Sequence, residues 1–165
     1  MDFNQTDSLK SAGFSGFKSV EDLWSDRSCI PKVKGVYLVI NSAHENTEYI
    51  NPGVGGFFKG KDPNLSVNEL KEHRVQGSQV VYIGKAGSLT GKSTLYSRLG
   101  QYLRFGQGKD VGHYGGRLIW QIKNPERLIF CWKPTPDEEP RLVEKKLLET
   151  YTHQFNTLPF ANLSR

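Results

Sequence analysis

Two short apolar segments constrain the fold of this 165-residue chain more than any other feature. They are GVYLVI at positions 35–40 and QVVYIG at positions 79–84. Nearly continuous apolar runs that are rich in β-branched residues are typical of buried strands. We therefore expect the first segment to be a central strand of a sheet and the second to be another strand.

The rest of the chain supplies helices and two further strands. Ser19 and Ser93 stand where helix N-caps are expected, and Leu95, Leu99 and Tyr102 repeat at helical spacing. This order of elements predicts a small α/β sandwich. The other expected elements are a helix through Trp24, a helix near 67–73, a helix after Ser93, strands at 117–122 and 127–132, and a last helix that starts within 134–140.

The predicted elements divide the chain into two parts. Residues 1–33 form an N-terminal helical extension, and residues 34–165 form one domain with an insertion at about 41–78. The insertion is polar and carries Pro52, Pro63 and several glycines. A loop of this length is uncommon in a small domain and is often functional.

Charge and cysteine content narrow the class of protein. The net charge of +5 favours a polyanionic partner. Cys29 and Cys131 stand far apart and outside any CxxC motif, so we expect reduced thiols and no zinc site. The N-terminus lacks a secretory pattern, and no apolar run is long enough to cross a bilayer. We expect a soluble, cytoplasmic protein with no membrane partner.

The segment GKAGSLTGKSTLYSRL, residues 84–99, looks like a phosphate-binding loop because it contains Gly91-Lys92-Ser93. The motif G-x-x-x-x-G-K-[ST] needs its first glycine at position 86, where this chain has Ala86. Loop length sets how many backbone N–H groups surround the phosphates, so Gly87 does not replace that glycine. An NTPase is therefore the least favoured of the functions considered.

The two predicted strands carry the tripeptides Gly35-Val36-Tyr37 and Tyr82-Ile83-Gly84, and the second is followed by Lys85-Ala86. Further along the chain follow RLGQY at 98–102, Glu144, and Phe155-Asn156. This ordered set resembles the GIY-YIG nuclease family over roughly residues 34–162. The segment EKKLLETYTHQFN is similar to part of the excision-repair incision nuclease, and residues 158–162 resemble the end of small stand-alone bacterial members. Val36 in place of isoleucine and the long gap between the tripeptides depart from the family pattern.

The resemblance implies a small, mainly antiparallel sheet flanked by helices, and a metal-dependent endonuclease that hydrolyses phosphodiester bonds in DNA. Of the two strand tyrosines, it favours Tyr37 as the general base, with Tyr82 positioning the water or the phosphate. The catalytic residues that it implies are Tyr37, Tyr82, Arg98, Tyr102, Glu144 and Asn156.

These residue types suit phosphodiester hydrolysis. A single carboxylate such as Glu144 is enough to hold Mg²⁺ or Mn²⁺, because Mg²⁺ keeps most of its waters. Arg98 offers a planar donor fork that matches phosphate. A phenol that accepts a proton from water needs nearby positive charge to lower its pKa, and Lys85, Arg98 and the metal would supply that charge.

Further basic and aromatic side chains are candidates for contact with the DNA backbone, which sets affinity and register rather than sequence preference. An inactive nucleic-acid-binding module on the same fold is the main alternative to the nuclease. The oligomeric state is open, and a dimer is one way to cut both strands. The candidate DNA-binding residues are Lys85, Lys92, Arg104, Lys109, His113, Tyr114 and Arg117.

Overall fold

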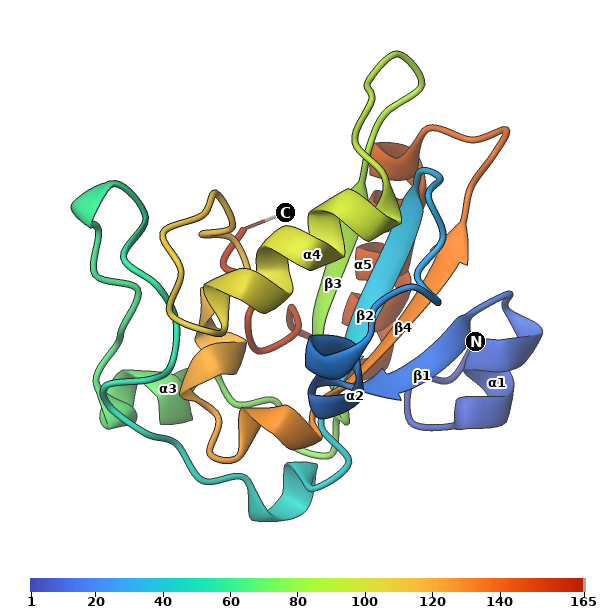
Figure 1. The fold of residues 1–165 in the computed structure, drawn as a ribbon. Helices are drawn as coiled ribbons and strands as arrows, with labels where there is room; N and C mark the ends of the chain where they lie inside the picture. Colours follow the sequence, from blue (N-terminus) through green and yellow to red (C-terminus); the bar gives the residue numbers. More distant parts are fainter. Residues whose placement is uncertain (165) are drawn as a thin grey trace.

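The computed structural model describes residues 1–164 and forms a small α+β domain around an antiparallel sheet of order β1-β4-β2-β3 (Figure 1). This architecture confirms the expected small antiparallel sheet with flanking helices. The strands are β1 (Ser15–Ser19), β2 (Gly35–Ile40), β3 (Val80–Ala86) and β4 (Ile129–Pro134). The α-helices are α1 (Thr6–Ser11), α2 (Val20–Ser25), α3 (Val67–His73), α4 (Leu95–Phe105) and α5 (Pro140–Phe155). Short 3₁₀ helices are η1 (His44–Asn46), η2 (Phe58–Gly60), η3 (Arg117–Gln121) and η4 (Pro125–Arg127).

Strand β2 is central, as its sequence predicts. It pairs with β3 on one side and with β4 on the other, and all its residues are buried. Val36 and Leu38 belong to the apolar cluster that includes α5, whereas Tyr37 and Val39 belong to the cluster that includes α4. The continuous apolar run is explained because both faces of the sheet are covered.

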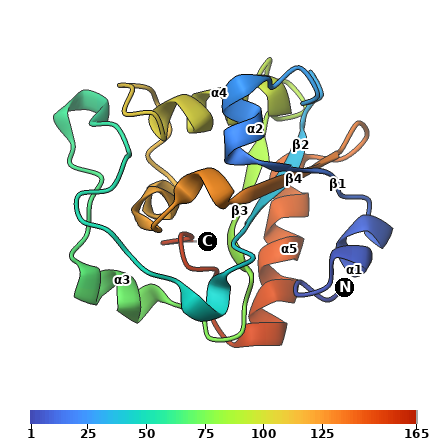
Figure 2. The same cartoon turned by 60° about the horizontal axis from the view of Figure 1, so that its bottom comes forward.

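Helices α4 and α5 cover opposite faces of the sheet (Figures 1 and 2). Leu95, Leu99 and Leu103 of α4 are buried, as are Val143 and Leu147 of α5. Leu95 and Leu99 belong to the spacing that predicted α4, and Val143 and Leu147 are also four residues apart. The site described below lies where the two helices approach the same end of β2 and β3.

The observed N-cap of α2 is the one expected from the sequence, whereas that of α4 is not. The Ser19 hydroxyl accepts a hydrogen bond from the Asp22 N–H at 3.1 Å and caps α2, as expected. Helix α4 is capped by Thr94 rather than by Ser93. Thr94 exchanges reciprocal hydrogen bonds with Ser97, at 3.1 and 2.9 Å, and this capping box places the first helical residue one position later than expected.

The prediction of a strand at 117–122 is wrong, because these residues form η3 and the start of an extended connection. Both edges of β4 are already paired, with β1 and with β2. Leu118, Ile119 and Trp120 are all buried, and a short helix in the core buries consecutive side chains that a strand would turn to opposite faces. The strand expected at 127–132 forms as β4, shifted by two residues.

The N-terminal segment contributes more than the helical extension that the sequence suggests. Strand β1 pairs with β4 and forms one edge of the sheet. A bulge between Gly16 and Lys18, with positive φ at Gly16 and Phe17, interrupts the alternation that would have revealed a strand. Residues 1–33 are thus joined to the sheet.

The insertion at 41–78 packs against the domain instead of standing away from it. The Gln121 side chain donates to the carbonyls of Ile50 and Leu65 at 3.1 and 2.8 Å, and accepts from the Leu65 N–H at 2.8 Å. Helix α3 spans the residues at which a short helix was expected. Within residues 1–164, no helix is long and apolar enough to span a membrane.

Candidate active site

A groove of about 450 Å³ opens between α4, α5 and the loop that joins β3 to α4. This loop projects beyond the sheet (Figure 1). The groove collects residues from β2, β3 and both helices, although they are far apart in sequence. Those of its lining residues that the sequence analysis singled out are Tyr37, Tyr82, Lys85, Lys92, Arg98 and Glu144.

Strand register brings the two tyrosines together. Tyr37 stands opposite Gly84 and Val39 stands opposite Tyr82, so both tyrosines lie on the same face, with ring centroids 6.0 Å apart. A Cβ atom on Gly84 would lie 2.5 Å from Cζ of Tyr37 and 2.8 Å from Cε1 of Tyr82. Only glycine at this position leaves room for the two rings.

The tyrosines differ in their access to the groove. Tyr37 is 1% exposed, whereas Tyr82 is partly exposed and lines two cavities. Burial raises the pKa of Tyr37 well above 10, and burial followed by the charge of Glu144 raises the pKa of Tyr82 to about 12. Arg98 acts in the opposite direction on both. Both hydroxyls are therefore protonated near neutral pH.

His113 lies behind Tyr37. Its Nε2 atom is 3.1 Å from the Tyr37 hydroxyl oxygen, and its ring stacks on that of Tyr102 at 3.7 Å with an interplanar angle of 1°. Burial, reinforced by Arg98, lowers the pKa of His113 to about 3, so the imidazole is neutral. With no exposed surface, His113 does not fit the predicted role of a DNA contact. A histidine in a glycine-rich loop has no periodicity from which this position could be inferred.

Tyr102 supports the groove from behind and does not line it. Its side chain is fully buried, and its hydroxyl donates to the Gly116 carbonyl at 2.5 Å. Gly116 has a φ of 74°, and a Cβ there would lie 2.5 Å from the Tyr102 hydroxyl. Tyr102 thus fixes the loop that carries His113, which is an indirect position for a residue expected to be catalytic.

Arg98 and Glu144 face the groove from α4 and α5. The Arg98 guanidinium donates to the Gly112 carbonyl at 3.0 Å and to Gln101 Oε1 at 3.3 Å, and these bonds orient it. Glu144 forms no salt bridge within residues 1–164. Burial raises the pKa of its carboxyl group, and Lys85 is the largest of the charges that oppose this effect.

The donor set around Glu144 fits a hydrated divalent cation. Within the described part of the chain, no three His, Cys, Asp or Glu side chains gather at one place. A site with one carboxylate suits Mg²⁺, which is often bound through one or two carboxylates and retains several waters. A half-buried carboxylate without an ion-pair partner is also a costly feature that a cation would compensate.

A second cavity of about 350 Å³ shares Tyr82 and Glu144 with the groove and is also lined by Arg117 and Asn162. The Asn162 side chain accepts from the Ile83 N–H at 2.9 Å and donates to the Ile83 carbonyl at 2.8 Å. It therefore holds the β3 edge beside Tyr82. Sequence reasoning assigned no role to Asn162, because nothing local shows that the chain end returns to β3.

Asn156, which was expected to be catalytic, lies elsewhere. It is exposed at the C-cap of α5, with a φ of 59°, and it lines neither cavity. Glu144 is twelve positions earlier on the same helix, which corresponds to about 18 Å at 1.5 Å per residue. The structure thus gives Asn156 its helix-ending role and brings Asn162 to the site instead.

The expected DNA-binding residues fall into three groups. Lys85 and Lys92 line the groove, whereas Lys109, Tyr114 and Arg117 lie on or next to the loop after α4. Arg104 lies on another side of α4, in a cavity with Trp24 and Tyr96. The structure therefore places Lys85 and Lys92 at the groove and Arg117 in the adjoining cavity, and leaves Arg104 away from both.

Comparisons of the chain with family models, with curated proteins and with solved structures give no match. The arrangement of side chains in the groove is therefore the basis on which a function is assigned.

Proposed function

We propose that this protein is a metal-dependent endonuclease of the GIY-YIG type that hydrolyses phosphodiester bonds in DNA. One observation carries the proposal. Tyr37, Tyr82, Arg98 and Glu144 come from four separate elements and meet at a single groove that also contains Lys85 and Lys92. A purely structural role for each residue would not require this convergence.

The groove offers donors for a phosphodiester group. Arg98 is permanently charged, and its carbonyl contact holds the guanidinium in place while part of it faces the groove. Lys85 and Lys92 add mobile ammonium groups on the same side. These three cations would bind the phosphate and stabilise negative charge that develops on its oxygens during hydrolysis.

We assign the proton-accepting role to Tyr82 rather than to Tyr37. Tyr82 has surface that reaches the groove, whereas the Tyr37 hydroxyl is buried against His113. Because the pKa of Tyr82 is about 12, its hydroxyl must first give its own proton to solvent water, and the resulting phenolate then accepts the proton of the attacking water; Arg98 favours the phenolate because its positive charge lowers the pKa of Tyr82. Tyr37 lies beside Tyr82, with its hydroxyl next to His113.

Glu144 is the residue that would hold the metal. When bound, Mg²⁺ or Mn²⁺ would supply positive charge to the phosphoryl oxygens and to the leaving oxygen. The position of Glu144 beside both Tyr82 and the groove cations is consistent with this role.

The two alternatives find less support. In a module that only binds nucleic acid, the half-buried carboxylate of Glu144 would cost stability and repel phosphate groups without contributing to binding. For an NTPase, the helix should begin at the Gly-Lys-Ser sequence, yet α4 begins at Leu95 and the Gly91 N–H is satisfied by the Ser88 hydroxyl at 2.8 Å.

Plasmid nicking with Mg²⁺ and with Mn²⁺ tests the proposal. We expect the wild type to relax supercoiled DNA, EDTA to stop it, and Glu144→Gln and Tyr82→Phe to lose the activity. Glu149→Gln, an exposed position on the same helix, is the matched control and should cut normally. A wild type that binds DNA but cuts with neither metal would leave the binding module as the better assignment. Thermal stabilisation by ATP and Mg²⁺ would instead favour the NTPase.

A further inference from the structure

Two loops outside the groove are held together as one surface, which we call the joined loops. They are residues 53–62 of the insertion and residues 105–117 after α4. The Gly56 N–H donates to the Phe105 carbonyl at 3.0 Å, and the Lys59 N–H donates to Asp110 Oδ1 at 3.2 Å. Gly56 also lies so close to the Lys109 carbonyl that a Cβ there would clash. The insertion is thus attached to the loop that carries His113.

The joined loops carry cations that have no acidic partner. They contain Lys59, Lys61, Lys109 and Arg117 against two carboxylates, Asp62 and Asp110. Both carboxylates already accept hydrogen bonds, Asp62 from Asn64 just after the first loop and Asp110 from the Lys59 backbone. The salt bridges of residues 1–164 involve none of these four cations.

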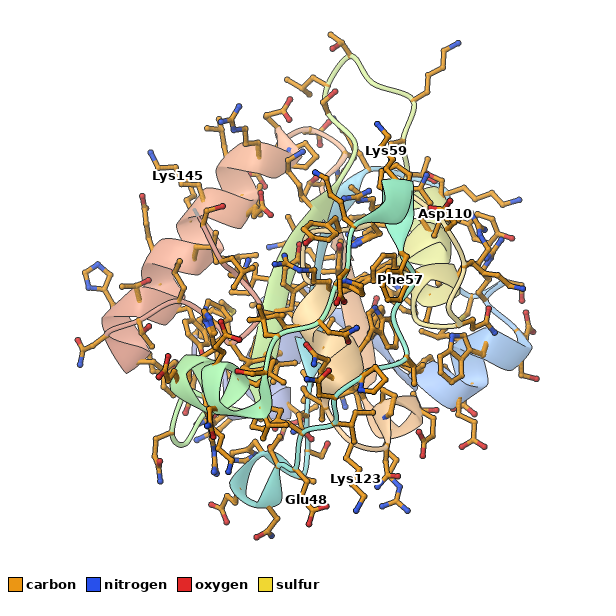
Figure 3. All side chains as sticks on the ribbon, turned by 90° about the vertical axis from the view of Figure 1, so that its left-hand side faces the viewer. Glu48, Phe57, Lys59, Asp110, Lys123 and Lys145 are labelled. Atoms are coloured by element: carbon orange, nitrogen blue, oxygen red, sulfur yellow. The ribbon has the colours of Figure 1, made fainter. Side chains whose placement is uncertain are left out.

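An exposed aromatic ring accompanies these cations. Phe57 is 53% exposed although it is a large apolar side chain. Figure 3 shows Phe57, Lys59 and Asp110 close together, with Lys145 on α5 well away from them. Basic side chains next to an exposed aromatic ring are the combination with which proteins hold nucleic-acid strands.

Arg117 and Tyr114 connect the joined loops to the candidate active site. Arg117 lines the second cavity with Tyr82 and Glu144, and its Cζ atom lies 4.0 Å from the centroid of the Tyr114 ring. The Tyr114 hydroxyl donates to the Asp62 carbonyl at 3.2 Å, and Lys61 lies over the same ring. Arg117 Nε is buried without a hydrogen-bond partner in the described chain. Because buried polar groups are usually hydrogen-bonded, this is consistent with a guanidinium that binds an anion.

We propose that the joined loops are a DNA-binding surface that grips the strand flanking the bond to be cut. Lys59, Lys61 and Lys109 contact successive phosphates, and Phe57 packs against an exposed nucleotide. Arg117 binds the phosphate nearest the site. This assignment rests on the proposed nuclease function and adds the location of substrate binding, which is the insertion.

Fluorescence anisotropy with a labelled DNA duplex that carries a single-stranded extension, in EDTA so that nothing is cut, tests the surface. The first variant combines Lys59→Asn with Lys61→Ala, since asparagine tolerates the left-handed φ of 53° at position 59. Phe57→Ala is the second variant. Lys145→Ala combined with Lys146→Ala removes the same charge from exposed positions on α5 and serves as the control. Thermal melting of each variant establishes that it is folded.

We expect the lysine variant to reduce the slope of log affinity against log salt by about 2, because two phosphate contacts are lost. Phe57→Ala should weaken binding about tenfold and leave the slope unchanged, as expected for lost stacking. The control should match the wild type. Equal slopes for the lysine variant, its control and the wild type would overturn the proposal, even if the wild type nicks plasmid. If the lysine variant loses slope as expected but the wild type never nicks plasmid, the DNA-binding surface is retained and the nuclease function is rejected.

Discussion

The two faces of the sheet are equally well buried but differ in chemistry. On the α5 side, β2 presents Val36, Leu38 and Ile40, which pack mainly against aliphatic side chains. On the α4 side it presents Tyr37 and Val39, and the cluster there is rich in groups with polar tips. Those groups include Tyr82, Tyr102, His113 and Trp120.

This difference separates stability from function. Aliphatic burial needs no partner and stabilises the fold by about 25 cal/mol per Å² of apolar surface. Every hydroxyl or ring nitrogen on the other face must find a hydrogen bond. Tyr37 and Tyr102 find them, but Trp120 Nε1 and His113 Nδ1 are buried without a partner in the described chain. The α4 face therefore gives up some stability in order to place hydroxyls beside the groove.

Neighbouring residues of β2 allow the sharpest test of this separation, beginning with Tyr37→Phe. We expect plasmid nicking to fall by about a hundredfold or more, because the Tyr37 hydroxyl helps to lower the pKa of Tyr82, the residue that accepts the proton. The melting temperature of Tyr37→Phe should fall less than that of a variant in which a large buried side chain is replaced by a cavity. Nicking rates and melting curves are measured on the same samples. Retained activity in Tyr37→Phe would contradict the assignment of function to the α4 face.

Leu38→Ala should have the opposite result. We expect the free energy of unfolding to fall by about 2–5 kcal/mol, because a fully buried leucine is replaced by a cavity on the α5 face. Nicking per folded molecule should be unchanged at a temperature where the variant is folded. Urea denaturation gives the first value, and a loss of specific activity in folded protein would blur the division between the two faces.

Tyr102→Phe examines the buttress behind the groove. Removal of its hydroxyl leaves the Gly116 carbonyl with the Ile119 N–H, at 3.3 Å, as its remaining donor, and we expect a loss of about 0.5–1.5 kcal/mol in stability. Nicking should fall less than with Tyr37→Phe, because the ring still stacks on His113. The ranking of the two variants in one nicking assay is the measurement, and a reversed ranking would place Tyr102 closer to the chemistry than its burial indicates.

The smallest effect concerns Glu144 and stability. Burial raises its pKa in the folded state, so the folded protein binds this proton more tightly than the unfolded chain does. The resulting stabilisation is complete below the unfolded pKa of about 4.5 and is lost as pH rises through the raised folded value. Without divalent metal at pH 7, Glu144→Gln should therefore melt slightly higher than the wild type. Added Mg²⁺ should reverse the order, and calorimetry at both conditions would show whether it does.

The sequence predicted the central strands and most helices because each carries a local signal. The apolar run GVYLVI and the repeat of apolar residues in α4 are each contained within a few consecutive residues. The prediction for residues 117–122 was wrong because their apolar run suits a strand or a buried helix equally well. Strand β1 was missed because its bulge interrupts the pattern. Both errors arise where pairing with a distant partner decides the structure.

The same distinction holds for the candidate site. The resemblance to the GIY-YIG family rests on residue types and their order along the chain, and on that basis it proposes Tyr37, Tyr82, Arg98 and Glu144 as site residues. Only tertiary structure places His113 against Tyr37, leaves Tyr82 more exposed than Tyr37 at the groove, and brings Asn162 instead of Asn156 to β3. These outcomes depend on which distant segments share a buried space and can satisfy each other's polar groups, and that is settled by packing of the whole domain.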